Sequence, residues 1–464
     1  MTASASASAS ASASAPASAP ASALAPQLLS AVAAGHDGAL EALTDALTKA
    51  GGPLLDALPD GGYLVTFVWI GPAEQIAVAS QLTMDDEGRV AQMERVAGTD
   101  VWYLSLPVTD DRLSVLYTFA VNDPSTRVST DDMMKLFQEE NTLHEFALQR
   151  ARCSHHDPFN PDRVTADIIH LGPEFDQHAK DSVLTLPGAD TETWFGPSRT
   201  PGTLTEHQVR SEVFGNERTI TVYTPAGYER GRGDYPLVFL LDGEYQVENY
   251  PEILDNLIEA GAIPPTVAAF VHNKNPMSRM VEMCCNPDLV TQYADELLPW
   301  LRAEYGAGED PSRTVATGAS YGGLGSVWLA HSRPDAIGRV LSLSGSHWWG
   351  QKDGFGGDES THSMGRDAEP EWLTRQIAAD PVTPTRYWVS AGTLENQPLP
   401  FGITLLAANR HLRSVLTAKG YDVAYDEFPG AHEHAGWRRA FANGLRHLLG
   451  DSAAKDPGTA GPQH

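Results

Sequence analysis

The sequence is poor in cysteine and in positive charge. Only three cysteines occur among the 464 residues, Cys153, Cys284 and Cys285. Two of them are adjacent, so the sequence excludes a disulfide framework, and the low count is typical of a reducing, cytoplasmic compartment. The 32 lysines and arginines are outnumbered by 60 aspartates and glutamates, which leaves a net charge of −28. Because nucleic-acid binding depends on a basic surface, nucleic acid is not an expected partner.

Long apolar runs are also missing. No segment approaches the ~18 consecutive apolar residues that a membrane-spanning helix requires, so no membrane association is expected. Residues 1–26 consist mainly of Ala, Ser and Pro, with no Lys or Arg and no compact apolar region. We therefore expect a disordered tail there rather than an export signal, and a second disordered tail over 451–464.

Between the tails the pattern of residue types and their spacing changes twice. Residues 27–58 carry Leu and Ala at helical spacing up to Gly51 and Gly52, which predicts a helical segment. Residues 59–150 hold short runs rich in β-branched and aromatic residues, which predict an antiparallel β-sandwich. These runs are 63–70, 75–82, 101–108 and 113–122. Residues 151–202 lack a regular pattern and are interpreted as a linker packed on the surface.

Residues 203–450 alternate continuous apolar runs with helical segments. This alternation predicts an α/β domain whose mostly parallel sheet is covered by helices on both faces. The expected strands are 219–225, 235–243, 267–271, 314–318, 339–345, 386–392 and 423–428. The longest expected helices are 288–306 and 401–420.

A candidate nucleophile lies where one of these strands meets a helix. The segment Gly318-Ala319-Ser320-Tyr321-Gly322 matches the pattern G-x-S-x-G directly after the strand 314–318. In this setting the glycines permit a sharp turn, and the helix that follows directs N–H dipoles toward developing negative charge. We therefore predict that Ser320 is the nucleophile of an α/β-hydrolase; a structural serine in a tight turn is the alternative.

Two turns are candidates for an oxyanion hole. The first N–H after the nucleophile belongs to Tyr321, and the segment FLLDGEYQ offers a second turn after an earlier strand. Gly243 would let the backbone approach closely there, with Glu244 or Tyr245 providing the second N–H. An ordinary strand-to-helix turn is the alternative for this segment.

The general base and its acid should follow the last two strands, because the triad on this fold runs in the order Ser, acid, His. The last strand leads into PGAHEHAGW, which contains His432 and His434. The strand before it leads to Glu395, which would orient the imidazole; a surface carboxylate is the alternative. A metal at the two histidines is disfavoured, since no third ligand stands at a suitable spacing.

Several segments together resemble the ferric enterobactin (enterochelin) esterases. They are ERVAGTDVWYLSL, DPFNP, LLDGEY, MSRMVEMCCNPD, GASYGGLGS, LSLSGSHWWG and GAHEHAGWRRAF, which lie between about residues 60 and 450. The resemblance implies a cytoplasmic two-domain α/β-hydrolase, with an N-terminal β-sandwich that covers or shapes the substrate site. It further implies hydrolysis of the trilactone of a catecholate siderophore, so that iron is released.

The resemblance also assigns residues. In the family pattern G-H-(D/E)-x-x-x-W-R the histidine stands five positions before the tryptophan, which selects His432 here and leaves His434 without a counterpart. Arg279 would lie near the substrate, with a surface salt bridge to Glu282 as its alternative. Trp348 and Trp349 would receive catechol rings, unless they are core residues.

A strongly acidic protein repels an anionic ferric tris-catecholate at long range, so local cations should offset this charge. The candidates are Lys274, Arg279, Arg438 and Arg439. If they do not converge near Ser320, a substrate ester that is neutral or differently charged is favoured. No cofactor is expected, because iron would arrive with the substrate. The alternatives are an esterase for another acyl, feruloyl or acetyl ester and a binding protein on a hydrolase scaffold.

Overall fold

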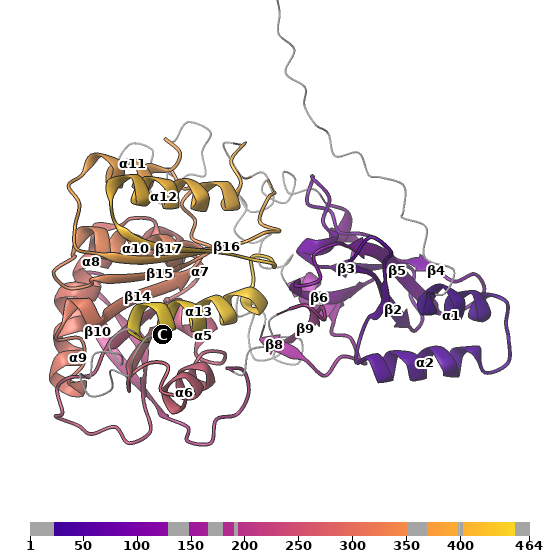
Figure 1. Cartoon of the computed structure of the whole chain (residues 1–464), viewed down its shortest axis with the longest axis horizontal. Helices are drawn as coiled ribbons and strands as arrows, with labels where there is room; N and C mark the ends of the chain where they lie inside the picture. The colour runs from indigo at the N-terminus through magenta and orange to yellow at the C-terminus, as the bar shows by residue number, and fades with distance from the viewer. Residues whose placement is uncertain are drawn as a thin grey trace, which may run out of the picture.

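The protein consists of two bodies joined side by side (Figure 1). The computed structural model describes residues 23–128, 148–165, 180–189, 194–350, 369–397, 399 and 402–450. The tail predictions for 1–26 and 451–464 lie almost entirely outside these residues. No helix in the described part of the chain has both the length and the apolar composition needed to cross a membrane.

The C-terminal body is built on an eight-stranded sheet in the order β10-β11-β13-β12-β14-β15-β16-β17. The strands are β10 (Thr203–Ser211), β11 (Asn216–Thr224), β12 (Leu237–Leu241), β13 (Val267–Val271), β14 (Thr314–Ala319), β15 (Arg339–Leu343), β16 (Arg386–Gly392) and β17 (Asp422–Phe428). All pairs from β13 to β17 are parallel, whereas β10 and β11 are added antiparallel at one edge. The predicted, mostly parallel sheet is therefore confirmed. Only β10 was not expected, because it is a largely exposed edge strand without an apolar run.

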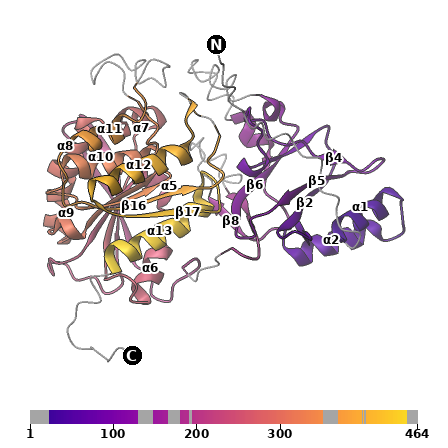
Figure 2. The ribbon, with the colours of Figure 1, turned by 45° about the horizontal axis from the view of Figure 1, so that its top comes forward.

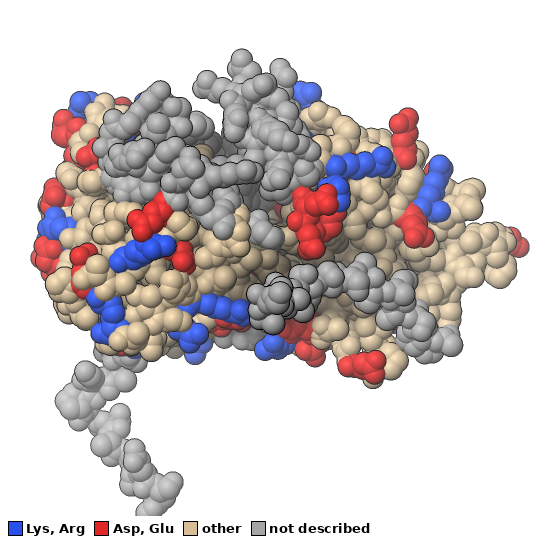
Figure 3. Space-filling view, turned by 90° about the horizontal axis from the view of Figure 1, so that it is seen from above, with Lys and Arg blue, Asp and Glu red and all other residues tan. Residues whose placement is uncertain are grey.

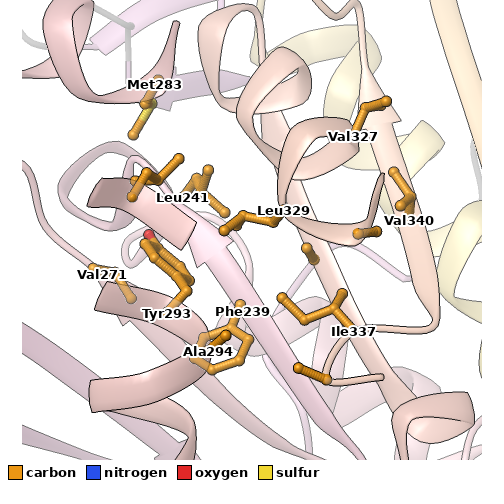
Figure 4. Close-up of a cluster of buried hydrophobic side chains, with 14 of the residues drawn as sticks. Phe239, Leu241, Val271, Met283, Tyr293, Ala294, Val327, Leu329, Ile337 and Val340 are labelled. Carbon is orange, nitrogen blue, oxygen red and sulfur yellow. The ribbon is translucent and has the colours of Figure 1, made fainter. Parts of the chain in front are cut away.

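Helices cover both faces of this sheet. They are α5 (Gly243–Gln246), α6 (Pro251–Glu259), α7 (Pro276–Met283), α8 (Pro287–Thr291), α9 (Leu298–Tyr305), α10 (Tyr321–Ser332), α11 (Trp372–Ala379), α12 (Leu405–Lys419) and α13 (His434–Leu449). Successive residues of a strand face opposite sides, so Phe239 packs with Tyr293 and Leu329 on one face (Figure 4), and Leu240 packs against α6 and α13 on the other. The predicted helix 288–306 is α8 and α9 joined by a π-helical turn, Gln292–Leu297.

The N-terminal body is a sandwich of two antiparallel sheets. One has the order β1-β2-β5-β4, and the other β3-β6-β9-β8, with β7 also paired to β6. The strands are β1 (Leu54–Ala57), β2 (Tyr63–Ile70), β3 (Ile76–Ala79), β4 (Glu94–Arg95), β5 (Val101–Val108), β6 (Ser114–Val121), β7 (Ser154–His155), β8 (Arg163–Thr165) and β9 (Lys180–Thr185). The predicted strands 63–70 and 101–108 match β2 and β5. Side chains of β2 and β6 form the core between the sheets.

The predicted helical segment 27–58 is only partly correct. Two helices, α1 (Leu24–Ala33) and α2 (Ala39–Ala50), occupy most of it, and α2 ends at Gly51 as expected. Residues Leu54–Ala57, however, form β1, which pairs antiparallel with β2. The Leu-rich sequence after the glycines becomes a strand because a sheet edge is available to it.

The predicted linker 151–202 instead contributes β7, β8 and β9 to the sandwich. Strand β9 pairs with β6 over Ser114–Tyr117. Within DPFNP, the Asp157 carboxylate accepts a hydrogen bond from the Tyr117 hydroxyl at 2.7 Å, and Asn160 donates to that hydroxyl at 3.1 Å. Both polar side chains are buried, and burial raises the pKa of Asp157. This segment looked irregular because its order comes from partners distant in sequence.

Candidate active site

Ser320 lies at the turn from β14 into α10, as predicted. Its backbone has φ 58° and ψ −120°, a conformation that is strained for a residue with a side chain. The flanking glycines are required by space: a Cβ on Gly318 would lie 2.7 Å from the backbone of Gly322, and one on Gly323 would lie 2.8 Å from Gly345. The turn therefore projects the serine hydroxyl from the carboxyl end of the sheet.

The end of the neighbouring strand β15 holds the serine in place. The Ser320 N–H donates to the carbonyl of Leu343 at 3.0 Å, and the Ser320 carbonyl accepts from the N–H of Ser346 at 2.9 Å. The two hydroxyls of Ser320 and Ser346 lie 3.3 Å apart and share a hydrogen bond. Within the described residues the hydrogen bond of the Ser320 hydroxyl is to Ser346 and not to His432.

His432 and Glu395 meet because β16 and β17 are parallel neighbours. Gly392 pairs with Phe428, and the chain beyond each continues side by side, with the Leu394 N–H donating to the Gly430 carbonyl at 2.9 Å. The imidazole Nδ1 of His432 lies 3.4 Å from the Glu395 carboxylate.

The environment of Glu395 matches the role of the acid. Its side chain is 1% exposed, and its carboxylate oxygens have no hydrogen-bond partner among the described residues. A buried carboxylate without partners gains much from a nearby imidazolium, so this arrangement supports Glu395 as the group that orients His432. The alternative of a surface carboxylate is wrong.

Trp437 contacts both histidines that the sequence offers as the base. Its ring meets the His432 ring edge to face at 4.9 Å and the His434 ring at 5.4 Å, and its Nε1–H donates to the Ser344 hydroxyl at 2.8 Å. His434 begins α13, is 1% exposed and also contacts Tyr250. It is therefore a packed core residue. No group of three or more potential metal ligands occurs among the described residues.

The second predicted turn lies beside the nucleophile. Strands β12 and β14 are parallel neighbours, so the turn after Leu241 is next to the turn that carries Ser320. Gly243 and Glu244 are the first two residues of α5, so their N–H groups have no acceptor within that helix. The N–H of Tyr245 donates to the Asp242 carbonyl at 3.1 Å, which leaves Gly243 and Glu244 as the candidates. A Cβ on Gly243 would lie 2.5 Å from the backbone of Phe270.

Arg279 ties these two turns together. Its guanidinium donates to both carboxylate oxygens of Asp242, at 2.6 and 2.7 Å, and approaches the Ala319 carbonyl at 3.5 Å. The guanidinium also lies over the Tyr321 ring at 5.5 Å. The alternative of a salt bridge to Glu282 is wrong, because Glu282 pairs with Arg218. Arg279 contacts the residues on either side of Ser320, but its charge is balanced by Asp242.

A buried carboxylate lies in the same turn. Glu244 accepts hydrogen bonds from the backbone and side-chain N–H groups of Asn273, at 2.9 and 2.7 Å. Burial, and then the neighbouring Asp242 carboxylate, raise the pKa of Glu244 to about 7. The electrostatics of the candidate oxyanion turn therefore change near neutral pH.

The paired tryptophans are core residues. Trp348 and Trp349 are each 5% exposed. Trp348 packs with Leu405 and the Tyr321 ring, and Trp349 meets Trp372 edge to face. The faces predicted to receive catechol rings are therefore covered by side chains, and the alternative assignment as core residues describes them better. Trp348 still supports Tyr321, the residue after the nucleophile.

Arg438 lines a pocket between the two bodies rather than the serine turn. The pocket has a volume of about 180 Å³, and its walls come from the sandwich, the 195–196 and 248–249 segments, α6 and α13. Three of its lining residues are cations, Arg163, Lys180 and Arg438, and two are acids, Glu248 and Glu252. Arg438 stacks over the Phe195 ring at 4.7 Å, and burial lowers its pKa.

The other predicted cations have separate surroundings. Lys274 is exposed, and Arg439 lies close enough to Asp426 to stabilise its carboxylate. With Arg279 paired to Asp242, the four cations do not form one group around Ser320 in the described residues. Figure 3 likewise shows basic and acidic side chains interspersed on the face seen from above. The cations that this structure does gather are those of the pocket between the bodies.

A strained serine after a central parallel strand, with a histidine and a buried carboxylate after the last two strands, defines an α/β-hydrolase with a serine nucleophile. The chain belongs to the family described as putative esterases, whose model matches residues 211–448. The N-terminal domain of the enterochelin esterases matches residues 64–195. The resemblance inferred from the sequence motifs is thus confirmed, and the second match spans most of the stretch that we interpreted as a linker.

The chain is similar to curated proteins over most of its length. It is 28% identical to the iron(III) enterobactin esterase of Dickeya dadantii over 438 residues, which cover 91% of this chain and 95% of that protein. It is 25% identical to the iron(III) salmochelin esterase of Escherichia coli O6:H1, over 83% of this chain and 87% of that protein.

Solved structures confirm the fold. The ferric enterobactin esterase of Salmonella typhimurium superposes with a TM-score of 0.69 at 24% identity, covering 87% of this chain and 98% of that structure. The enterobactin esterase of Shigella flexneri, solved in the presence of enterobactin, superposes with a TM-score of 0.66 at 24% identity, over 86% of this chain and 96% of that structure.

Proposed function

We propose that this protein is a serine esterase that hydrolyses the ester bonds of a catecholate siderophore trilactone of the enterobactin type. The observation that carries this proposal is the contact of His432 with the buried Glu395 at 3.4 Å, at the same carboxyl edge of the parallel sheet where Ser320 follows β14 and the turn at Gly243 follows β12. The substrate class is supported by the relatives, which are named iron(III) enterobactin and salmochelin esterases and match both bodies of the chain.

The residues suit a two-step acyl transfer. The Ser320 hydroxyl attacks an ester carbonyl while the His432 Nε2 takes its proton, and the resulting oxyanion is held by the N–H groups of Tyr321 and of Gly243 or Glu244. Collapse breaks the bond to the alcohol oxygen, which receives the proton from His432. A water then attacks the acyl-enzyme with His432 again as base, and Ser320 is regenerated with a free carboxylic acid as product.

Anionic parts of the siderophore need a local positive environment on an acidic protein. The pocket containing Arg163, Lys180 and Arg438 supplies three cations against two acids, so it carries a net charge of +1 if all five groups are ionised. We place an anionic part of the substrate there, and we expect binding to weaken as salt increases. No cofactor takes part in the proposed steps, since iron is part of the substrate.

The proposed reaction fits a reducing compartment. Cys153, Cys284 and Cys285 are all free thiols, and burial raises the pKa of Cys284 and Cys285 so that they are inert as nucleophiles. This supports a cytoplasmic location, in which a siderophore that has entered the cell would be opened.

The direct test is to incubate the protein with ferric and iron-free trilactones and to identify the products by mass spectrometry. We expect linear and monomeric fragments from the wild type and none from Ser320→Ala. Ser414→Ala is the matched control, because its hydroxyl is exposed on α12 and only bonds back to the helix. A fluorophosphonate label should attach to the wild type and to this control, and not to Ser320→Ala.

An esterase for another acyl substrate is the second candidate. It is favoured by the separate surroundings of the four predicted cations, of which Arg279 is balanced by Asp242. If the wild type cleaved p-nitrophenyl acyl esters but left both trilactones intact, the siderophore assignment would be wrong and the esterase assignment would stand. If Ser320 took no fluorophosphonate label, the site would be a binding site on a hydrolase scaffold.

A further inference from the structure

The loop that carries His432 is held by the N-terminal body. This loop, residues 429–433, joins β17 to α13 in the C-terminal body. The N–H of Ser114 donates to the Pro429 carbonyl at 3.2 Å, and the N–H of Leu116 donates to the Glu433 carboxylate. The N–H of His432 itself donates to the side-chain carbonyl of Gln81 at 2.6 Å. Three hydrogen bonds from one short loop therefore cross between the bodies.

The loop lies beside the part of β6 with which β3 does not pair. Strand β3 pairs with β6 only over Thr118–Val121 and ends at Ala79. On the other side of β6, the Leu113 carbonyl accepts from the Leu186 N–H at 2.9 Å, next to β9. Successive backbone groups of a strand point to opposite edges, so Ser114 and Leu116 face the edge that β3 leaves open. The loop takes the place that a longer β3 would fill.

Packing against the sandwich also holds the loop. Ala431 is 0% exposed and belongs to the core of the sandwich, together with Phe67 and Val115. A Cβ on Gly430 would lie 3.1 Å from the Ser114 carbonyl oxygen, so the two backbones are in close contact. Helix α13, which follows the loop, also contacts the sandwich, and Figures 1 and 2 both show its start beside β8.

Gln81 stands on a rigid support. It begins the 3₁₀ turn Gln81–Thr83 directly after β3. The Thr83 hydroxyl is hydrogen-bonded to the carbonyls of Val78 and Ser80, and the Ser80 hydroxyl accepts from Leu82. The side chain of Gln81 is a neutral amide, so its hydrogen bond to the His432 N–H does not change with pH. The partner of His432 is separated from it by 351 positions in sequence.

We propose that Gln81 is a positioning residue for His432 and that the N-terminal body is thereby a structural part of the catalytic centre. The inference rests on the proposed role of His432 as the general base. Glu395 orients the imidazole through Nδ1, while Gln81 and β6 fix the backbone from which the imidazole extends. Both constraints are needed to direct Nε2 at Ser320, since a displacement of about 1 Å can cost about 100-fold in rate.

The test compares variants of Gln81 on a small and a large ester. Gln81→Met removes the acceptor with little change in size, and Gln81→Glu keeps an acceptor. Gln92→Met is the matched control: Gln92 lies in the same body, is also partly buried, and bonds to Val90 and Thr126 rather than to the loop. A p-nitrophenyl acyl ester and a trilactone are assayed for kcat and KM, and urea midpoints are recorded for each variant.

We expect Gln81→Met to lower kcat by about 10- to 100-fold on both esters, with KM changed by less than about threefold. Gln81→Glu should restore most of the loss, and Gln92→Met should behave as the wild type. If Gln81→Met folds poorly, Gln81→Asn, whose amide is withdrawn by one methylene, should show the same loss. Fluorophosphonate labelling of Ser320 should slow in parallel, because it requires the same base.

Three results would overturn the proposal. An unchanged kcat on both esters would show that His432 does not depend on Gln81. A loss confined to the trilactone, with the small ester unaffected, would mean that Gln81 contacts substrate rather than positioning the base. If the wild type neither hydrolysed the small ester nor took the label, the proposed function would fail, and the positioning role would fail with it.

Discussion

The pair formed by Arg279 and Asp242 allows two roles of Arg279 to be separated by experiment. The sequence places this arginine near the substrate, whereas the structure shows the Nε and one Nη of its guanidinium donating to the Asp242 carboxylate. Replacing Arg279 with Met keeps the volume of the side chain and removes its charge. Asp242 would then be left with Asn273 as its remaining side-chain donor, at 2.7 Å.

The size of the effect follows from burial. The side chain of Asp242 is 4% exposed and that of Arg279 is 19% exposed, so water cannot replace the lost partner effectively. Removing one member of a buried pair leaves an uncompensated charge and typically costs about 3–5 kcal/mol. Because Asp242 precedes Gly243 with φ 63° and Arg279 also approaches Ala319, the loss should also loosen both turns that flank the nucleophile.

The assay combines unfolding in urea with turnover of two esters. Arg279→Met should lower the urea midpoint of the C-terminal body and reduce kcat on a p-nitrophenyl ester as much as on a trilactone. The double variant with Asp242→Asn should recover part of the stability, because it removes the carboxylate charge that the single variant leaves buried and unpaired. This recovery is the coupling that a double-mutant cycle measures.

A different pattern would refute this reasoning. If Arg279→Met unfolded at the same urea concentration as the wild type and only raised KM for the trilactone, Arg279 would be a substrate cation. Asp242→Asn would then have no compensating effect in the double variant.

Three further predictions concern the same edge of the sheet. His432→Ala should abolish turnover of every ester, whereas His434→Ala should keep most of it and lower the urea midpoint by the equivalent of about 1–3 kcal/mol, because His434 is a buried core residue; reversed outcomes would mean that the base is misassigned. Gly243→Ala should lower kcat by about 100-fold in steady-state assays, since the added Cβ would overlap the backbone of Phe270 and displace the oxyanion turn. An unchanged kcat would show that this turn does not hold the oxyanion. Because the pKa of Glu244 is raised to about 7, its contribution to stability is present below pH ~4.5 and lost as pH rises through about 7, by up to ~3 kcal/mol. The urea midpoint should therefore fall less between about pH 5 and pH 8 in Glu244→Gln than in the wild type, and an equal fall would contradict the raised pKa.

Residues whose role depends on neighbours in sequence were predicted well. The turn around Ser320 follows from glycine spacing and from the strand and helix on either side of it. Strands β2, β5, β13 and β16 match the predicted ranges, because runs of β-branched and aromatic residues carry their own signal. The order of Ser320, Glu395 and His432 along the chain follows from the strand order typical of this fold.

Residues whose role depends on a distant partner were predicted poorly. Strand β9 was assigned to a linker because only its pairing with β6 makes it a strand. Trp348 and Trp349 were predicted to receive catechol rings, but the sequence alone does not tell whether other side chains cover the faces of a tryptophan ring. The pairing of Asp242 with Arg279 was missed, although Asp242 lies in the segment FLLDGEYQ. Its position directly before Gly243, in the candidate oxyanion turn, was the signal that could have identified it.

The sequence by itself determined the class of chemistry, because a nucleophile turn and the pattern of strands are local properties of the chain. It did not determine how that chemistry is supported. The contacts of His432 with Gln81, of Arg279 with Asp242 and of the 429–433 loop with β6 join segments 37 to 351 residues apart or lie between the two bodies. Such contacts exist only when the whole chain has packed, since burial and the ends of neighbouring strands select the partners. The tertiary structure alone therefore decided that the N-terminal body holds the loop of the proposed base.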